Sequence, residues 1–463
     1  MSVRRLGRGG APGRAEAPVR LVHLGLGNFF RAHQCWHTEH AGDGAGWGIA
    51  AFSGRSNSPL VECLSAQEGL FTLVTRGSAT DRFEIVGSLS RVHDAAEHEA
   101  WLGYFEAPAL AAVTITITEA GYVRGSNGGL DADLPAIRAD LEALRRNPRG
   151  LVRTAPARLL AALLARRHAD AGRLALVPCD NVSDNGTMAK RMLCDLAELL
   201  HPGAAAWIAD SVSFVTTMVD RITPRTTPRD VRAVFEGTGS EDRCPVVTEP
   251  FHEWVLSGEF PASRPRWEDA GATFTDDITP YEQRKLWLLN GGHSLLAYAG
   301  SIRGHHTVAG AVSDDTCRSW LEQWWSEASP HVAQAQADTG AYRAALLDRF
   351  ANPRMHHRLE QIAADGSQKL PIRILPVLRA ERAAGRLPLG AVRVLAAWVC
   401  HLRGAGVAVV DVRAEELSAL AGGPLSEAVR RVLDALDPEV GADGEVKATV
   451  IEQCHALEGA GAR

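Results

Sequence analysis

The chain has 463 residues, of which 46% are apolar, and its 49 basic and 55 acidic residues give a net charge of -6 at pH 7. This length predicts two or three domains with large cores, and the charge balance argues against nucleic acid or an anionic membrane as a partner. No run approaches the ~20 apolar residues of a membrane span. The scattered cysteines predict free thiols and a cytoplasmic location. Residues 1–18, rich in Arg, Gly and Ala, are expected to form a disordered leader.

A nucleotide-binding βαβ unit is predicted at residue 19. The apolar run Val19–Leu24 is typical of a strand, and a glycine turn and a helix through about His40 follow it. In such units the helix N-terminus faces a pyrophosphate. Phe30 stands where the third glycine of G-x-G-x-x-G would sit, so by glycine spacing alone a tight turn without a ligand is an equal alternative. The candidate cofactor residues of the turn are Gly25, Gly27, Asn28, Phe29 and Arg31.

Two further strands are predicted in this unit, at residues 47–52 and 113–118. The first strand is not followed by the acidic residue that binds the ribose of NAD. Arg55 follows it instead, and this side chain either pairs with the 2′-phosphate of NADP or is exposed to solvent. NAD and NADP are therefore both possible cofactors. The second alternates apolar and hydroxyl residues, as a half-buried strand does. Because strands of an α/β sheet present their carboxyl ends to the ligand, Thr118 and Glu119 are also candidate cofactor residues.

The next segments continue the α/β pattern. Residues 155–168 indicate an amphipathic helix, and residues 174–177 a buried strand that leads into a polar loop containing Asn181. That loop is either a plain turn or, because it follows a strand, part of a site. A strand at residues 211–219 closes on Asp220 and Arg221, and such a dipeptide is ordinarily a surface or structural ion pair. Residues 225–277, richer in Pro, Gly and charge, are expected to be an excursion and linker.

From Tyr281 onward the periodicity is helical, which divides the chain into a dinucleotide-binding domain with insertions, 19–277, and a helical substrate domain, 278–463. The fold class is therefore α/β: a Rossmann-type N-terminal domain with a mostly α-helical C-terminal domain. Residues 365–371, around Lys369, are expected to form a turn between helices. Helices are predicted near residues 314–328, 341–349, 372–384, 391–402 and 414–420, with two more after them.

The first helix of the second domain carries a base, an amide and an imidazole. At about 100° per residue, Lys285, Asn290 and His293 project at about 0°, 140° and 80°, so that they can line one pocket. By itself this pattern is more typical of a solvated face. The adjacent Gly291 and Gly292 each cost about 1 kcal/mol of helix stability, which indicates that substrate or cofactor approaches the backbone there.

Four of these stretches together resemble the mannitol dehydrogenase family, the polyol-specific long-chain dehydrogenases. The resemblance implies zinc-independent hydride transfer between NAD or NADP and a secondary alcohol or ketone, with Lys285 as general base. Asn181 and Asn290 match the asparagines that hold the developing oxyanion. His293 and Lys369 match substrate-positioning residues, and Asp220 matches an acid near the site. The matching stretches are residues 25–34, residues 179–181, residues 219–224, and Lys285 with Asn290 and His293.

Within that family the chain looks closer to the mannonate oxidoreductase, or fructuronate reductase, branch. The similarity lies in Asn352-Pro353, Arg358, Gln361 and residues 365–371; mannitol dehydrogenases tend to carry an arginine in place of Gln361. This favours D-mannonate and D-fructuronate over mannitol or arabinitol as the substrate pair, with the carboxylate meeting Lys369, Arg358 or Arg373. A monomer and a homodimer both remain open.

Two other classes of protein compete with this interpretation. A sensor of sugars or nucleotides on the same fold would need no general base, so Lys285 argues against it. A zinc-dependent alcohol dehydrogenase would need ligands at metal spacing, and the pairs His305-His306 and His356-His357 have no cysteine nearby in the sequence. No metal is therefore expected.

Overall fold

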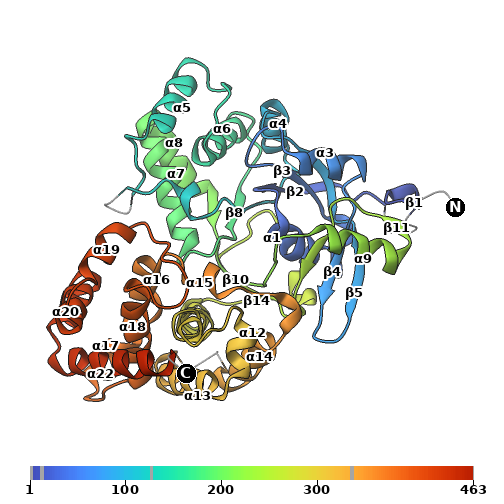
Figure 1. The fold of residues 1–463 in the computed structure, drawn as a ribbon. Helices are drawn as coiled ribbons and strands as arrows, with labels where there is room; N and C mark the ends of the chain where they lie inside the picture. Colours follow the sequence, from blue (N-terminus) through green and yellow to red (C-terminus); the bar gives the residue numbers. More distant parts are fainter. Residues whose placement is uncertain (1–3, 11–14, 126–128, 334–337, 462–463) are drawn as a thin grey trace. The chain divides into compact units, whose positions relative to one another are not determined.

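The computed structural model describes residues 4–10, 15–125, 129–333 and 338–461. The chain forms two compact units, Met1–Ile278 and Thr279–Arg463, which we call unit 1 and unit 2. Unit 1 is α/β and unit 2 is helical (Figure 1). The division falls next to the boundary expected at residue 277.

The centre of unit 1 is a parallel sheet of six strands whose order reverses between its third and fourth members. This is the doubly wound order of dinucleotide-binding folds, so the predicted Rossmann-type domain is confirmed. From edge to edge the strands are β6 (Leu89–His93), β3 (Gly48–Phe52), β2 (Val19–Leu24), β7 (Ala112–Ile115), β8 (Leu174–Pro178) and β9 (Val212–Phe214). The strand expected at residues 113–118 stops at Ile115.

Both faces of this sheet are buried, which explains why its strands are apolar at consecutive positions. In β2, Val22 and Leu24 pack on one face and Leu21 on the other. Helices α4, α5, α6, α7 and α8 contribute to the first face, and α2 with Trp254 and Trp267 to the second. The bounds are α2 (Trp36–His40), α3 (Pro59–Ala66), α4 (His98–Glu106), α5 (Pro135–Arg146), α6 (Ala155–His168), α7 (Asn185–Leu200) and α8 (Pro202–Ser211).

Part of the N-terminal leader has regular structure, so the expectation of disorder is wrong for residues 4–10. Strand β1 (Arg4–Arg5) pairs in parallel with β11 (Ser240–Glu241). Leu6 is buried, and the Arg8 guanidinium donates to the carbonyl oxygens of Gly87 and Leu89 at 3.0 Å each. These contacts fix the segment to the rest of unit 1.

Residues 225–277 are also more ordered than an excursion and linker. They supply α9 (Pro228–Thr238) and strands of two small sheets, in the orders β12-β4-β5 and β10-β13-β14. The strand expected at residues 211–219 is divided, because β9 belongs to the large sheet and β10 to a small one. The bounds are β4 (Phe71–Arg76), β5 (Asp81–Val86), β10 (Thr216–Asp220), β12 (Val246–Thr248), β13 (Glu253–Ser257) and β14 (Thr273–Phe274).

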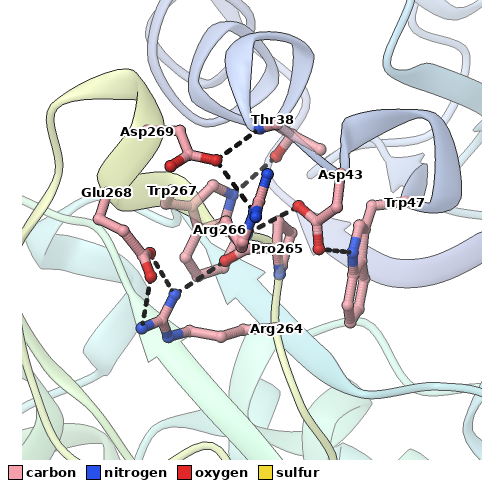
Figure 2. A network of polar contacts seen from close by, with 10 residues as sticks. Thr38, Asp43, Trp47, Arg264, Pro265, Arg266, Trp267, Glu268 and Asp269 are labelled. Carbon is pink, nitrogen blue, oxygen red and sulfur yellow. Dashed lines mark hydrogen bonds and ion pairs between the residues drawn. The ribbon is translucent and has the colours of Figure 1, made fainter.

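A polar network fastens this region to the turn after α2 (Figure 2). Asp43 accepts from the backbone N–H of Arg266 and from Trp47 Nε1, both at 2.9 Å. The fully buried Trp267 donates through Nε1 to Thr38 Oγ1 at 3.0 Å. Since the indole and both carboxylate oxygens of Asp43 have partners, the late segment is part of the core of unit 1 and not a linker.

Unit 2 is built around a long helix, residues 279–300, which is seen end-on in Figure 1 and which we call the central helix; residues 288–300 are buried. Of the segment expected to be a turn at residues 365–371, all but Asp365 lies in α16, so that expectation is wrong from Gly366 onward. Helices α12, α13, α15, α16 and α18 pack against this helix, and α22 packs on α18. The bounds are α12 (Val308–Ser313), α13 (Asp315–Ala328), α14 (Thr339–Phe350), α15 (Leu359–Ala363), α16 (Gly366–Arg373), α17 (Leu375–Ala383), α18 (Leu389–Leu402), α19 (Ala414–Leu420), α20 (Leu425–Leu436), α21 (Pro438–Ala442) and α22 (Gly444–Gly461). Across the residues described, no helix combines the length and apolar character that crossing a membrane requires.

Candidate active site

The glycine turn after β2 lies where the strand order of the large sheet reverses. Gly25 has φ +116°, and a Cβ there would stand 2.0 Å from the carbonyl oxygen of Thr116, so glycine is required for steric reasons. The turn is held by Gly25 N–H donating to Phe52 O at 3.0 Å and by Thr116 Oγ1 donating to Gly25 O at 2.9 Å. A Cβ on Gly27 would meet only Gly25 O, at 3.6 Å, so internal packing does not demand a glycine at that position.

Arg31 is used inside unit 1. Its side chain is 2% exposed, and Nη1 donates to Cys244 O at 2.5 Å while Nη2 donates to Asn28 Oδ1 at 2.8 Å. Its Nε donates to Gly27 O at 3.3 Å. Burial lowers the pKa of this guanidinium. The arginine therefore holds the glycine turn in place, and any part it has in cofactor binding is exerted through Gly27 and Asn28.

The position of the missing third glycine is filled by a ring stack. Phe30 lies parallel to His23 of β2, with centroids 3.5 Å apart. His23 has Thr114 Oγ1 at 2.8 Å from Nδ1 and Thr116 Oγ1 at 3.0 Å from Nε2, and burial lowers its pKa to about 3. A neutral imidazole can donate through one nitrogen and accept through the other, so both hydroxyl contacts are satisfied. The phenylalanine thus provides core packing where other members of the fold class have glycine.

The remaining candidates of unit 1 follow the carboxyl ends of strands. Thr118 and Glu119 lie beyond β7, with Glu119 exposed, and Asn181 is exposed in the loop after β8. Asp220, the last residue of β10, is buried. Its neighbour Arg221 is also buried and donates to Ala32 O at 2.5 Å, which agrees with a structural role for that arginine.

In unit 2 the central helix departs from α geometry where the candidate base lies. Residues Lys285–Asn290 form a π-helical segment, which is rare and often occurs at functional sites. Because π-helical hydrogen bonds join residues five positions apart, Lys285 and Asn290 lie on the same side of the segment, closer than the about 140° that an α-helical projection gives. His293 follows in α11 (Gly291–Leu295), and all three side chains are buried.

Two buried polar atoms of this group are left unsatisfied by the described part of the chain. Asn290 Nδ2 and His293 Nε2 make no hydrogen bond with any residue placed there. A buried donor or acceptor left unpaired costs about 1–3 kcal/mol. Phe350 stacks on the His293 ring at 4.5 Å and His357 meets its edge at 4.9 Å. Burial lowers the pKa of His293 well below its ordinary value, and nearby His357, Arg349 and Arg373 lower it further, so the imidazole is neutral.

Two cations of α16 lie beside the central helix. Lys369 Nζ donates to Ala364 O at 2.5 Å and to Ile362 O at 3.2 Å. Arg373 Nη1 donates to Ser294 Oγ at 3.3 Å and lies 3.5 Å from Asn290 O. Burial lowers the pKa of Lys369, and the positive charge of Arg373 adds to that effect. Burial also lowers the pKa of Arg373 to about 10.

The other two residues considered for substrate recognition are at the surface of unit 2. Arg358 is 61% exposed and forms an ion pair with Glu360 at 2.9 Å. Gln361 is exposed on α15. Both are more exposed than Lys369 and Arg373, which are half-buried on α16.

The glycine pair of α11 does not leave room for a ligand, which corrects the sequence-based interpretation. A Cβ on Gly291 would stand 2.7 Å from Trp324 Cζ2, and one on Gly292 would stand 2.9 Å from Leu321 Cδ1 and 3.3 Å from Trp325 Nε1. Both positions are filled by side chains of α13. The glycines are therefore required for the close approach of two helices.

Comparison with known proteins decides the family. The mannitol dehydrogenase Rossmann domain matches residues 19–269, and the mannitol dehydrogenase C-terminal domain matches residues 277–451. The chain belongs to the mannitol dehydrogenase family. It is 36% identical to D-mannonate oxidoreductase of Escherichia coli (strain K12) over 398 residues, 83% of this chain and 80% of that protein. It is 35% identical to mannitol 2-dehydrogenase of Cereibacter sphaeroides over 386 residues, 82% of this chain and 80% of that protein.

A solved structure gives the same result. Pseudomonas fluorescens mannitol 2-dehydrogenase, in a ternary complex with NAD and D-mannitol, superposes with a TM-score of 0.80 at 31% identity, over 99% of this chain and 94% of that one. The resemblance inferred from four short motifs is thus confirmed. As a member of the mannitol dehydrogenase family, this chain is an oxidoreductase that acts on alcohol groups of polyols or sugar acids.

One argument against zinc needs correction. His305, Asp314 and Cys317 bring ligand atoms within 4.8 Å of one another, although no cysteine lies near His305 in the sequence. Asp314 Oδ2, however, accepts from Arg303 Nη2 at 2.8 Å and lies 3.0 Å from His305 Nε2. The Arg303 guanidinium therefore already neutralises the negative charge that this carboxylate would offer to a metal ion.

Several neighbours of the family site residues could not be found from the sequence. Phe350 and His357 contact His293 from more than fifty positions further along the chain, and no local pattern marks them. Asp180 was visible only as part of the motif around Asn181, although its carboxyl group binds three donors of the loop after β7. A polar residue at the end of a buried strand was the one signal available for it.

Proposed function

We propose that this chain is an NAD-dependent, zinc-independent dehydrogenase that interconverts the secondary alcohol and ketone of a sugar acid, namely D-mannonate and D-fructuronate. The doubly wound sheet and the relative solved with NAD support the cofactor. NADP is the second candidate because Arg55 is exposed just after β3. Mannitol and arabinitol are the alternative substrates, since mannitol 2-dehydrogenase and D-arabinitol 4-dehydrogenase are relatives of similar identity.

The observation that carries this proposal is the pair of unsatisfied polar atoms on the helix of Lys285. Asn290 Nδ2 and His293 Nε2 are buried without partners among the described residues, and both can serve a substrate oxygen. When hydride leaves the carbinol carbon for the nicotinamide, the hydroxyl proton must be taken up by a base, which we assign to the neutral amine of Lys285. An amide N–H directed at the oxygen stabilises the alkoxide-like state, a contribution of about 3 kcal/mol per donor in other enzymes.

The remaining assignments follow the family resemblance. Asn181 of unit 1 is proposed as a second amide donor and His293 as a positioning residue. Asp220 is proposed as an acid of the substrate site. The cofactor is assigned to Gly25, Gly27, Asn28, Phe29, Thr118 and Glu119, with Arg31 supporting the turn from inside.

A sugar acid is preferred over a neutral polyol because positive charge accumulates near His293. Arg349 and Arg373 both depress the pKa of this imidazole, and Arg373 also depresses that of Lys369. The Nε of Arg373 is buried and has no hydrogen-bond partner in the parts of the chain that are described. A carboxylate would meet that donor, and a guanidinium suits it geometrically.

The first test removes the proposed base. Lys285→Ala is expected to abolish turnover while the dissociation constant for NADH, followed by its fluorescence, stays close to that of the wild type. Lys447→Ala, at a half-buried position of α22, is the matched control and should keep full activity. More than a tenth of wild-type activity in Lys285→Ala would refute the assignment of the base.

The second test decides the substrate. D-mannonate, D-mannitol, D-arabinitol and their keto partners are assayed with both nicotinamide cofactors, on the wild type and on Arg373→Lys. We expect the sugar acid to be preferred, and we expect its KM to rise in the variant more than that of any neutral polyol. Strong activity on fructose with none on fructuronate would replace the sugar acid by a polyol. Cofactor binding without hydride transfer on any of these compounds would indicate a sensor.

We also propose a cytoplasmic location. All eight cysteines are free, including two pairs whose thiols are in contact, Cys63 with Cys244 and Cys400 with Cys454. Thiols in contact remain reduced in a reducing compartment.

A further inference from the structure

The loop that follows β7 has an unusual backbone. Thr118 has φ +63° and ψ +165°, a region occupied almost only by glycine, and Val123 has φ +50° and ψ +56°, which is rare for a β-branched residue. Between them lies one turn of 3-10 helix, Glu119–Tyr122. Strain of this kind persists only where the surrounding contacts hold the backbone, and it concentrates at ligand sites.

One carboxyl group supplies three of those contacts. Asp180 Oδ1 accepts from the backbone N–H of Thr118 at 2.7 Å, and Oδ2 accepts from the N–H of Ile117 at 3.2 Å and from the hydroxyl of Tyr122 at 3.0 Å. The side chain thus binds both the start and the end of the strained loop. Burial raises the pKa of the Tyr122 phenol, so that its hydroxyl remains a donor, and the neighbouring Asp180 adds to that effect.

The backbone of Asp180 is fixed independently of its side chain. Its carbonyl oxygen accepts from Asn185 Nδ2 at 3.2 Å and from Val182 N–H at 2.8 Å. The same Asn185 amide donates to Thr217 O at 2.9 Å, and its Oδ1 accepts from Thr217 N–H at 2.9 Å. Asn181 is therefore the middle residue of a turn that the Val182 N–H to Asp180 O bond closes. The Asn185 side chain connects this turn to β10.

We propose that Asp180 is a positioning residue, which sets the Thr118–Tyr122 loop at the carboxyl edge of β7 and fixes it to the turn that presents Asn181. The idea rests on the proposed function, in which Thr118 and Glu119 contact the cofactor and Asn181 contacts the substrate oxygen. It assigns no contact with substrate to Asp180 itself. Two adjacent strand ends are coupled because a carboxylate carried by the segment after β8 accepts hydrogen bonds from the segment after β7.

Asp180→Asn tests the role with little change in volume. A carboxylate accepts on both oxygens, whereas an amide directs an NH2 group at either Thr118 N–H or Ile117 N–H, so that at least one donor faces another donor. We expect the dissociation constant for NADH to rise about tenfold, equivalent to about 1.4 kcal/mol, and kcat to fall. Hydrogen exchange of the Ile117 and Thr118 amides should become faster, because their acceptor is weakened.

Asp140→Asn is the matched control. Asp140 is equally buried and also accepts three hydrogen bonds, from Arg153 N–H at 3.0 Å, Thr154 N–H at 2.8 Å and Thr154 Oγ1 at 2.7 Å, where α6 begins. We expect it to lower the unfolding temperature while the NADH dissociation constant and kcat stay unchanged. Tyr122→Phe, which leaves both N–H bonds to Asp180, should change NADH binding less than threefold and covers the case in which Asp180→Asn fails to fold.

The outcomes separate this inference from the proposed function. If the wild type binds NADH and Asp180→Asn binds it equally well with unchanged kcat, the positioning role is refuted and the dehydrogenase assignment stands. The same conclusion follows if Asp140→Asn weakens NADH binding as much as Asp180→Asn does. If the wild type binds neither NADH nor NADPH, the proposed function is refuted. The positioning role is then refuted as well, whatever the hydrogen-exchange rates of the loop amides.

Discussion

Replacing Gly291 by alanine distinguishes packing from ligand space inside the central helix of unit 2. The added Cβ would lie 2.7 Å from Trp324 Cζ2 and 2.9 Å from both Cε2 and Nε1. Carbon atoms in favourable contact are about 3.5–4.0 Å apart. The indole is fully buried and donates through Nε1 to Trp287 O at 2.8 Å, so it cannot move away and keep that bond.

The magnitude follows from three opposing contributions. Overpacking a buried site costs about 1–3 kcal/mol, and losing the indole hydrogen bond costs about 1 kcal/mol. Replacing a helical glycine with alanine contributes about 1 kcal/mol in the other direction. The net expectation is that Gly291→Ala lowers the free energy of unfolding by about 1–3 kcal/mol, or about 2–4 °C in Tm for each kcal/mol in a unit of this size.

Urea denaturation of the intact protein, followed by tryptophan fluorescence, measures this change. Gly103→Ala is the control, because Gly103 lies inside α4, where a Cβ would find none of the described atoms within 4 Å, and should gain about 1 kcal/mol from helix propensity. A Gly291→Ala protein as stable as the wild type, or more stable, would refute the packing argument. If such a protein had also lost activity, the original interpretation of the glycines as space for a ligand would be correct.

Three further predictions concern acid stability, thiols and metal. Arg386 and His331 hold the pKa of Glu381 down at about 2, so this carboxylate stabilises the fold above its ordinary pKa of about 4.3, and that stability is lost as pH falls toward 2. The stability difference between wild type and Glu381→Gln, measured by urea denaturation, should therefore shrink between pH 6 and pH 3; a constant difference would contradict the pairing. In the native protein a thiol reagent should modify Cys63 and Cys194, which are half-buried, well before the six buried cysteines, as peptide mass spectrometry would show. Dialysis against a chelator should leave turnover unchanged, and loss of activity restored by zinc would reverse the assignment of a metal-free reaction.

Features that depend on local order could be predicted from the sequence. Short runs bounded by turn residues indicated five of the six strands of the large sheet, because both faces of a parallel sheet are covered and consecutive residues are buried. The edge strand β6 was not predicted. The glycine turn at Gly25, the change to helical periodicity near Tyr281 and the four family motifs also lie in short stretches. They were therefore recognisable without any knowledge of which segments meet.

The contacts of those residues, by contrast, depend on the folded chain. Position 291 requires glycine because Trp324 packs on it. The Arg31 guanidinium donates a hydrogen bond to a carbonyl oxygen more than two hundred residues away in the sequence. The partners of Asp180 likewise lie on a different strand from its own motif. For the central helix, the sequence placed Lys285 and its companions on one segment, but the π-helical repeat that aligns the lysine with the asparagine became evident only in the structure. A local pattern reports the periodic burial of its own segment, whereas a side chain's role depends on neighbours that folding brings from elsewhere in the chain.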